Sequence, residues 1–163
     1  MDRKLLSIYL NDHLAGSTIG LELSRRARGS NEGTEYGEAL AGIAKEIEED
    51  RETLQRLMSE LGVRRDHPKV TAAWVAEKFG RLKPNGRLLS YSPLSRLVEL
   101  EALALGISGK LSLWDALAEV AGEDARLDRE ELRRLAERAE RQRKEVWRLH
   151  QRAAHEAFAA QAS

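Results

Sequence analysis

The stretch TEYGEALAGIAKEIEEDRETLQRLMSEL, residues 34–61, decides the fold. Its apolar residues recur from Tyr36 to Leu61 at alternating spacings of four and three. This period places them on one face of an α-helix, as in a helix that packs within a bundle. One polar residue, Asp50, interrupts that face. The stretch therefore predicts a long amphipathic helix that carries a carboxylate in its buried seam.

The sequence before this stretch predicts its antiparallel partner. Residues 2–28 are free of proline and rich in leucine. The sequence GSNEG at 29–33 separates the two helices, with a left-handed helix stop expected at Gly29 and an N-cap at Thr34. The first 61 residues therefore predict a helical hairpin.

The C-terminal part repeats this organisation. Ser92 and Pro93 suit the start of a third helix, and Asp128 begins a capping box for a fourth. Gly122 offers the stop between them. Gly106 and Gly109 lie inside the third helix, which weakens it and allows a kink or break there, because each interior glycine costs about 1 kcal/mol against alanine.

The connection between the hairpins is too long for a turn, since bundle connections usually take about 2 to 8 residues. We expect it to cross the bundle, to leave the second and third helices parallel, and to hold a short helix around Trp74 and Phe79. The predicted fold is an all-α, single-domain four-helix bundle. Its parts are hairpin 1 at about 2–61, the crossover at about 63–92 and hairpin 2 at about 94–158, within a domain of 1–163.

Composition limits the classes of function. The 163-residue chain has 27 basic and 27 acidic residues and no cysteine, which excludes disulfides, thiolate nucleophiles and iron–sulfur clusters. No apolar run approaches the roughly 18 residues that a membrane span needs. No glycine-rich phosphate loop, Gly-x-Ser-x-Gly elbow or zincin helix is present. We therefore expect a soluble, cytoplasmic protein with no recognisable catalytic motif.

The residues that bear most on function are polar residues on otherwise apolar helix faces. Asp50 and His13 lie about equally far along the chain from the turn of the first hairpin. In an antiparallel pair they would lie at the same height, so we expect them to meet. In the second, we expect Glu101 to meet His150, Gln142 or Arg143. Such buried pairs fix helix register at some cost in stability. The candidate site residues on these faces are Asp12, His13, Asp50, Glu101 and His150.

The two hairpins, the crossover and the mid-helix polar residues resemble the ferritin-like four-helix bundles. Di-iron members of that superfamily use a Glu from each of two helices and a Glu-x-x-His pair from each of the others. No Glu-x-x-His occurs here, although Asp12 and Glu101 match the positions of the single carboxylates. The resemblance therefore implies a degenerate metal site, with no cofactor expected. The alternative is an iron or manganese oxidoreductase or storage protein that uses the five candidate residues.

The leading hypothesis is thus a non-enzymatic ferritin-like protein that acts by binding or assembly. A second surface is basic: between residues 64 and 96 there are eight basic and two acidic residues. This excess of positive charge predicts contact with nucleic-acid phosphates, an anionic surface or an acidic partner. The alternative is that these cations are simply solvated. The acidic run at 46–52 makes a homo-oligomer a further hypothesis. The basic residues of interest are Lys78, Arg81, Lys83 and Arg87.

Overall fold

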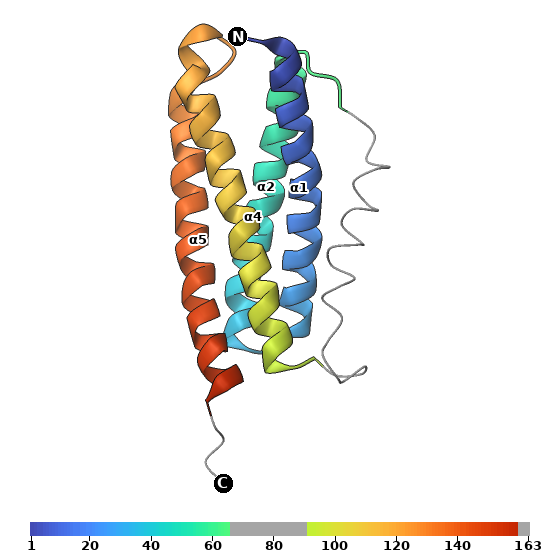
Figure 1. Ribbon diagram of the computed structural model, residues 1–163, viewed down its shortest axis with the longest axis vertical. Helices are drawn as coiled ribbons and strands as arrows, with labels where there is room; N and C mark the ends of the chain where they lie inside the picture. Colours follow the sequence, from blue (N-terminus) through green and yellow to red (C-terminus); the bar gives the residue numbers. More distant parts are fainter. Residues whose placement is uncertain (66–90, 160–163) are drawn as a thin grey trace.

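The computed structural model describes residues 1–65 and 91–159, and there the chain is all-helical. The prediction of an all-α protein with four long helices is confirmed, with every helix end within two residues of its expected place. The elements, shown in Figure 1, are α1 (Arg3–Ser30), α2 (Glu35–Glu60), α4 (Pro93–Val120), the short 3₁₀ helix η1 (Ala121–Glu123) and α5 (Arg129–Phe158).

The predicted N-caps begin the helices. The Thr34 hydroxyl accepts the Gly37 N–H, the Ser92 hydroxyl accepts the Ser95 N–H, and the Asp128 carboxylate accepts the Glu130 N–H. Each cap satisfies a backbone donor that has no partner inside its helix. These contacts explain why the predicted helix starts were accurate.

The stop expected at Gly29 is wrong. Gly29 is helical, α1 continues to Ser30, and the left-handed conformation falls instead at Gly33, with a φ of 74°. The reason is Asn31, whose backbone N–H donates to the Arg28 carbonyl and whose side-chain amide donates to the Ala27 carbonyl at 2.7 Å. These bonds carry the helix past Gly29 before the chain turns.

Helices α2 and α4 run in the same direction, as expected. The Asn31 amide before α2 donates to the Tyr91 hydroxyl before α4, and Arg126 after α4 donates to the Glu60 carbonyl at the end of α2. Both helices therefore begin at one end of the bundle and finish at the other (Figure 1). The short helix expected in the crossover lies outside the described residues.

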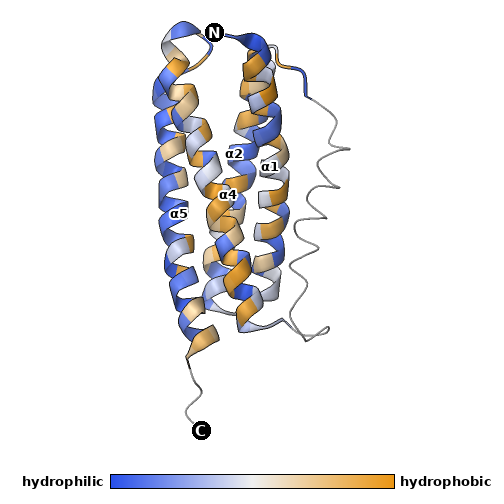
Figure 2. Ribbon diagram, viewed as in Figure 1, coloured by the Kyte–Doolittle hydropathy of each residue, from blue (hydrophilic) through white to orange (hydrophobic). Residues whose placement is uncertain are grey.

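The core is a continuous apolar cluster to which all four helices contribute. Leu10, Leu40, Leu100 and Leu132 are among its fully buried members, one from each helix. Burial of such a side chain contributes about 1.5–3 kcal/mol. Figure 2 shows α5 as a mostly hydrophilic helix, which therefore presents only a narrow apolar face to this core. Among residues 1–65 and 91–159, no helix is long and apolar enough to span a membrane.

Helix α4 runs without a break through Gly106 and Gly109. The interruption that these residues allow does not occur, because α4 packs against both α1 and α5 and tertiary packing overrides the low helix propensity of glycine. The two glycines instead leave open space beside α4.

Candidate functional site

A buried network of charged and polar side chains crosses the middle of the bundle. Its centre is Asp50 of α2, whose side chain is only 1% exposed. The Lys110 ammonium of α4 donates to Asp50 Oδ2 at 2.5 Å, and the Arg138 guanidinium of α5 donates to Asp50 Oδ1. A buried carboxylate needs such partners, because an unpaired ion in a protein interior costs several kcal/mol.

Gln142 of α5 extends the network. Lys110 Nζ also donates to Gln142 Oε1 at 2.5 Å, and Gln142 Nε2 donates to Glu46 of α2 at 2.7 Å. The pKa of the Lys110 ammonium lies below its ordinary value, because burial disfavours its charge more than the nearby Asp50 carboxylate favours it. Three helices thus hold the lysine amine in a fixed position.

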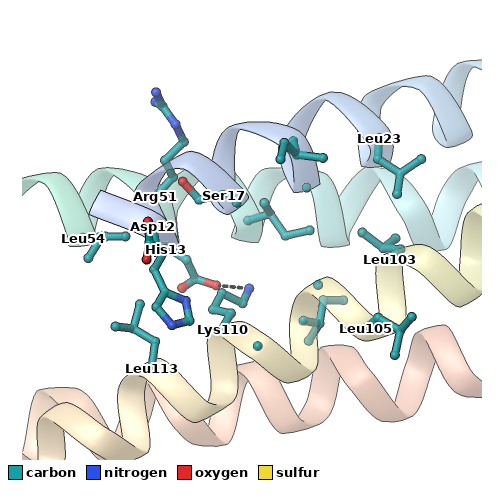
Figure 3. Close-up of a pocket in the computed structure, with 18 of the residues that line it drawn as sticks. Asp12, His13, Ser17, Leu23, Arg51, Leu54, Leu103, Leu105, Lys110 and Leu113 are labelled. Atoms are coloured by element: carbon teal, nitrogen blue, oxygen red, sulfur yellow. Dashed lines mark hydrogen bonds and ion pairs between the residues drawn. The ribbon is translucent and has the colours of Figure 1, made fainter. Parts of the chain in front are cut away.

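A cavity of about 610 Å³ lies beside this network, between α1, α2 and α4. Such a volume falls within the range of about 300–1,000 Å³ typical of small-molecule sites. Figure 3 shows Lys110 at the wall of the cavity, with Leu23, Leu103 and Leu105 extending along it away from the lysine. Most of the wall is apolar, formed by Ile19, Leu23, Ile47, Leu54, Ala102, Leu103, Leu105, Ile107, Leu113 and Trp114.

The polar groups of the cavity gather near Lys110. His13 of α1 extends toward α4 between Leu113 and Lys110, as Figure 3 shows. Its imidazole packs edge-on against Tyr9, with ring centroids 4.5 Å apart, and burial lowers its pKa, so the ring is neutral at pH 7. The wall therefore offers a neutral donor and acceptor beside a cation, followed by an apolar surface.

Glycines keep the cavity open. Gly16 and Gly20 of α1 and Gly106 and Gly109 of α4 line it, and a Cβ atom added at any of them would meet nothing within 4 Å. Close contact between α1 and α4 therefore does not require these glycines. Their effect is to omit the side chains that would otherwise occupy this space.

The structure brings three of the five predicted site residues to the cavity wall, namely Asp12, His13 and Asp50. Asp12 is exposed and His13 is half-buried. The expected bond between Asp50 and His13 is replaced by the ion pairs of Asp50 with Lys110 and Arg138. Cationic partners satisfy the buried carboxylate more fully than a neutral imidazole can, because they also neutralise its charge.

The other two predicted residues lie elsewhere. Glu101 is exposed, and His150 stacks on Trp147 with ring centroids 4.9 Å apart, so the expected pairing of Glu101 with His150, Gln142 or Arg143 is wrong. The buried carboxylate of α4 is Glu99, which accepts hydrogen bonds from Arg26 at 2.9 Å and from the Tyr91 hydroxyl at 3.0 Å.

The prediction for Glu101 is wrong because this residue is rotated around the axis of α4, away from the buried face. The apolar seam of α4 passes through Leu100, Leu103 and Ile107. Glu101 follows Leu100 by one residue, which on an α-helix is a rotation of about 100° away from that seam. The carboxylate of Glu101 therefore faces solvent.

The residues of this chain do not fit the metal centre that the ferritin-like resemblance implies. Among residues 1–65 and 91–159, no group of three or more His, Asp or Glu side chains is placed to hold a metal ion. Asp50 is already paired with two cations, and Glu101 and His150 are absent from the cavity wall. The basic residues Lys78, Arg81, Lys83 and Arg87 lie outside the described residues.

Lys110 is the residue of the candidate site that the sequence-based prediction did not include. It follows Leu103 and Ile107 and precedes Trp114 and Leu117, again with spacings of four and three. Lys110 thus interrupts the seam of α4 just as Asp50 interrupts the seam of α2. Candidate metal ligands are carboxylates and histidines, so a prediction based on them does not include the basic partner of the pair.

In comparisons with protein-family models, with curated proteins and with solved structures, nothing matches this chain. The cavity and the buried network beside it are therefore the features of this chain that bear on its function.

Proposed function

We propose that the protein binds a small, mainly apolar molecule with one polar group, held in the cavity between α1, α2 and α4. The observation that carries this proposal is the cavity itself, a space of about 610 Å³ with an apolar wall and polar groups gathered near Lys110. Sites for small molecules have this composition, with a hydrophobic lining and a few convergent polar groups that fix orientation. The proposal agrees with the hypothesis of a protein that acts by binding.

The charges of the wall favour an uncharged polar group. Lys110 is balanced by Asp50, while Arg51 and Asp12 add one charge of each sign. His13 offers a neutral imidazole. An alcohol, ketone or aldehyde can exchange hydrogen bonds with these groups without bringing a second unpaired charge into a half-buried site.

The test is equilibrium binding of an uncharged fluorescent probe, N-phenyl-1-naphthylamine, whose emission rises in an apolar site. We expect saturable binding of one probe per chain and displacement by 1-decanol. Gly106→Leu should place an isobutyl group in the cavity and weaken probe binding at least about tenfold, which is a loss of about 1.4 kcal/mol. Binding can be followed by fluorescence titration.

Gly42→Leu is the matched control. Gly42 is an exposed helical glycine of α2, outside the cavity wall, and an added Cβ there also meets nothing within 4 Å. This variant should bind the probe as the wild type does. Equal affinity in the wild type and in Gly106→Leu would overturn the proposal.

A ferritin-like relationship remains a hypothesis, supported by the parallel course of α2 and α4 that a crossover between two hairpins produces. Binding of iron or manganese remains the alternative function, and elemental analysis of protein purified without chelator tests it. One or two metal ions per chain would favour that alternative, and background levels would exclude it.

A further inference from the structure

Lys110 combines three features that seldom occur together. The residue lines an apolar cavity, its side chain is 14% exposed, and a carboxylate accepts from its amine at 2.5 Å. A lysine withdrawn from water is the usual nucleophile for carbonyl compounds, because it gives up a proton more readily than a solvated lysine does. A lysine that served only to pair with Asp50 would not require an adjoining cavity.

We propose that Lys110 forms a reversible imine with an apolar aldehyde that occupies the cavity. The inference rests on the proposed binding function and adds to it the chemical class of the ligand and the atom that holds it. The aldehyde carbon would lie at Nζ, with its hydrocarbon chain along the leucine-rich wall toward Leu23, Leu103 and Leu105.

The reaction balances without an oxidant or a reductant. The ammonium first releases one proton to water, and the free amine attacks the carbonyl carbon to form the new C–N bond. The carbonyl oxygen then takes up protons and leaves as water while the C=N bond forms. In sum, an ammonium and an aldehyde give a protonated imine and water, so two of the three ammonium hydrogens leave with the oxygen and the positive charge is conserved.

The network around Lys110 suits both the lysine and its product. The ammonium has three hydrogens, and the described residues provide acceptors for two of them, Asp50 Oδ2 and Gln142 Oε1. A protonated imine keeps one N–H, which Asp50 can continue to accept. The carboxylate thus has a cation to pair with before and after the reaction, so formation of the imine leaves no buried charge unpaired.

Each neighbouring helix contributes to the charge at the amine. Asp50 and Glu46 of α2 favour the ammonium, Arg138 of α5 disfavours it, and His13 of α1 is neutral above its own lowered pKa. The net result, with burial, is a pKa of Lys110 below the ordinary value. A lower pKa raises the share of free amine at pH 7.5, so Lys110 should react faster than a solvated lysine.

The experiment is reductive trapping on the full chain. The protein is incubated with decanal and sodium cyanoborohydride at pH 7.5, digested, and mapped by mass spectrometry. We expect labelling of Lys110 several-fold above that of the highly exposed Lys45 and Lys144, the internal controls. An excess of 1-decanol should suppress labelling at Lys110 and leave the two control lysines unchanged.

Gly106→Leu tests the role of the cavity and leaves the Lys110 amine in place. It is preferred to a substitution of Lys110, because loss of that buried cation could unfold the protein. This variant should lose the Lys110 label and keep the labels at Lys45 and Lys144. Labelling of Lys110 no faster than that of Lys45, in a protein that still binds N-phenyl-1-naphthylamine, would overturn the imine and leave the binding function intact. Failure of the probe to bind would overturn the binding function, and the imine with it.

Discussion

Two interfaces of this bundle are built in opposite ways. Between α2 and α5, charged side chains meet along the whole length, from Glu35 with Arg148 and Arg152 at one end to Arg56 with Glu131 toward the other. Between α1 and α4, the polar contact is Arg26 with Glu99 near one end, and beyond it the helices border a cavity lined by glycines. The first interface is filled by long side chains, and the second is left open.

The contrast explains why the cavity lies between α1 and α4. Arginine and glutamate side chains occupy space with their aliphatic stems while their ends pair, and such pairs cross the α2/α5 interface at both ends and in the middle. Glycine provides neither bulk nor charge. The Asp50–Lys110 pair lies where the two interfaces meet, since Asp50 bonds to Arg138 on one side and lines the cavity on the other.

Removal of Asp50 should produce the largest effect on stability. Asp50→Ala leaves the mostly buried Lys110 and Arg138 without their shared carboxylate, and loss of one partner of a buried pair costs about 3–5 kcal/mol. Urea unfolding followed by circular dichroism measures this loss. Glu48→Ala is the control, because its pair with Arg25 is half-exposed on both sides and contributes at most about 1 kcal/mol. Equal losses in the two variants would show that the network is solvated.

The turn between α1 and α2 should give the next largest effect. A Cβ added to Gly37 would lie 2.3 Å from the Asn31 backbone oxygen and 2.9 Å from its carbon. Gly37→Ala must therefore move the backbone of the turn, at a cost of about 1–3 kcal/mol. The same urea titration measures it. Gly42→Ala, an exposed helical glycine with open space around it, should instead gain stability.

The sequence predicted most of the fold, because the fold depends on local signals. The period of α2 and the caps at Thr34, Ser92 and Asp128 act within a few residues, and they placed the helices correctly. Gly29 was misjudged because a side chain two residues away, Asn31, continues the helix. The local rule was sound, but a competing hydrogen bond decided the outcome.

The site was less predictable, because it depends on which helices face each other. The seam of α2 identified Asp50 as buried, but its partners belong to α4 and α5, 60 and 88 residues away. The relative rotation of those helices, which sets the partners, is a property of the packed bundle. Gly106 and Gly109 were noted as weak points of a helix, whereas their role is the space beside it.

Substitution at the cavity glycines should change stability in the opposite direction to Gly37→Ala. Gly106→Ala adds a methyl group that meets nothing within 4 Å and removes the helix penalty of glycine, so we expect a gain of about 1 kcal/mol. The gain should match that of Gly42→Ala in urea unfolding. A loss of stability would mean that α1 and α4 close upon each other in solution, and that the contrast between the two interfaces is smaller than the structure indicates.

The smallest effect is expected at the polar end of the α1/α4 interface, where Tyr91 donates to Glu99 and accepts from Asn31. Burial raises the pKa of Tyr91 from its usual 10 to about 12. Between these values the unfolded chain loses the phenol proton and the folded chain keeps it, so the contribution of Tyr91 is complete below pH 10 and is lost as the pH rises toward 12. Solvent screens the effect, because the side chain is more than a third exposed.

Tyr91→Phe isolates this contribution. Between pH 10 and 12 the free energy of unfolding should fall more steeply in the wild type than in the variant. Below pH 9 the two curves of this free energy against pH should run parallel, with the variant lower because it lacks the hydrogen bonds of the phenol. Urea unfolding at a series of pH values measures both slopes, and all other titrating groups are common to the two proteins. Parallel curves up to pH 12 would mean that water reaches the phenol freely, and that the α1/α4 interface is open at this end as well as at the cavity.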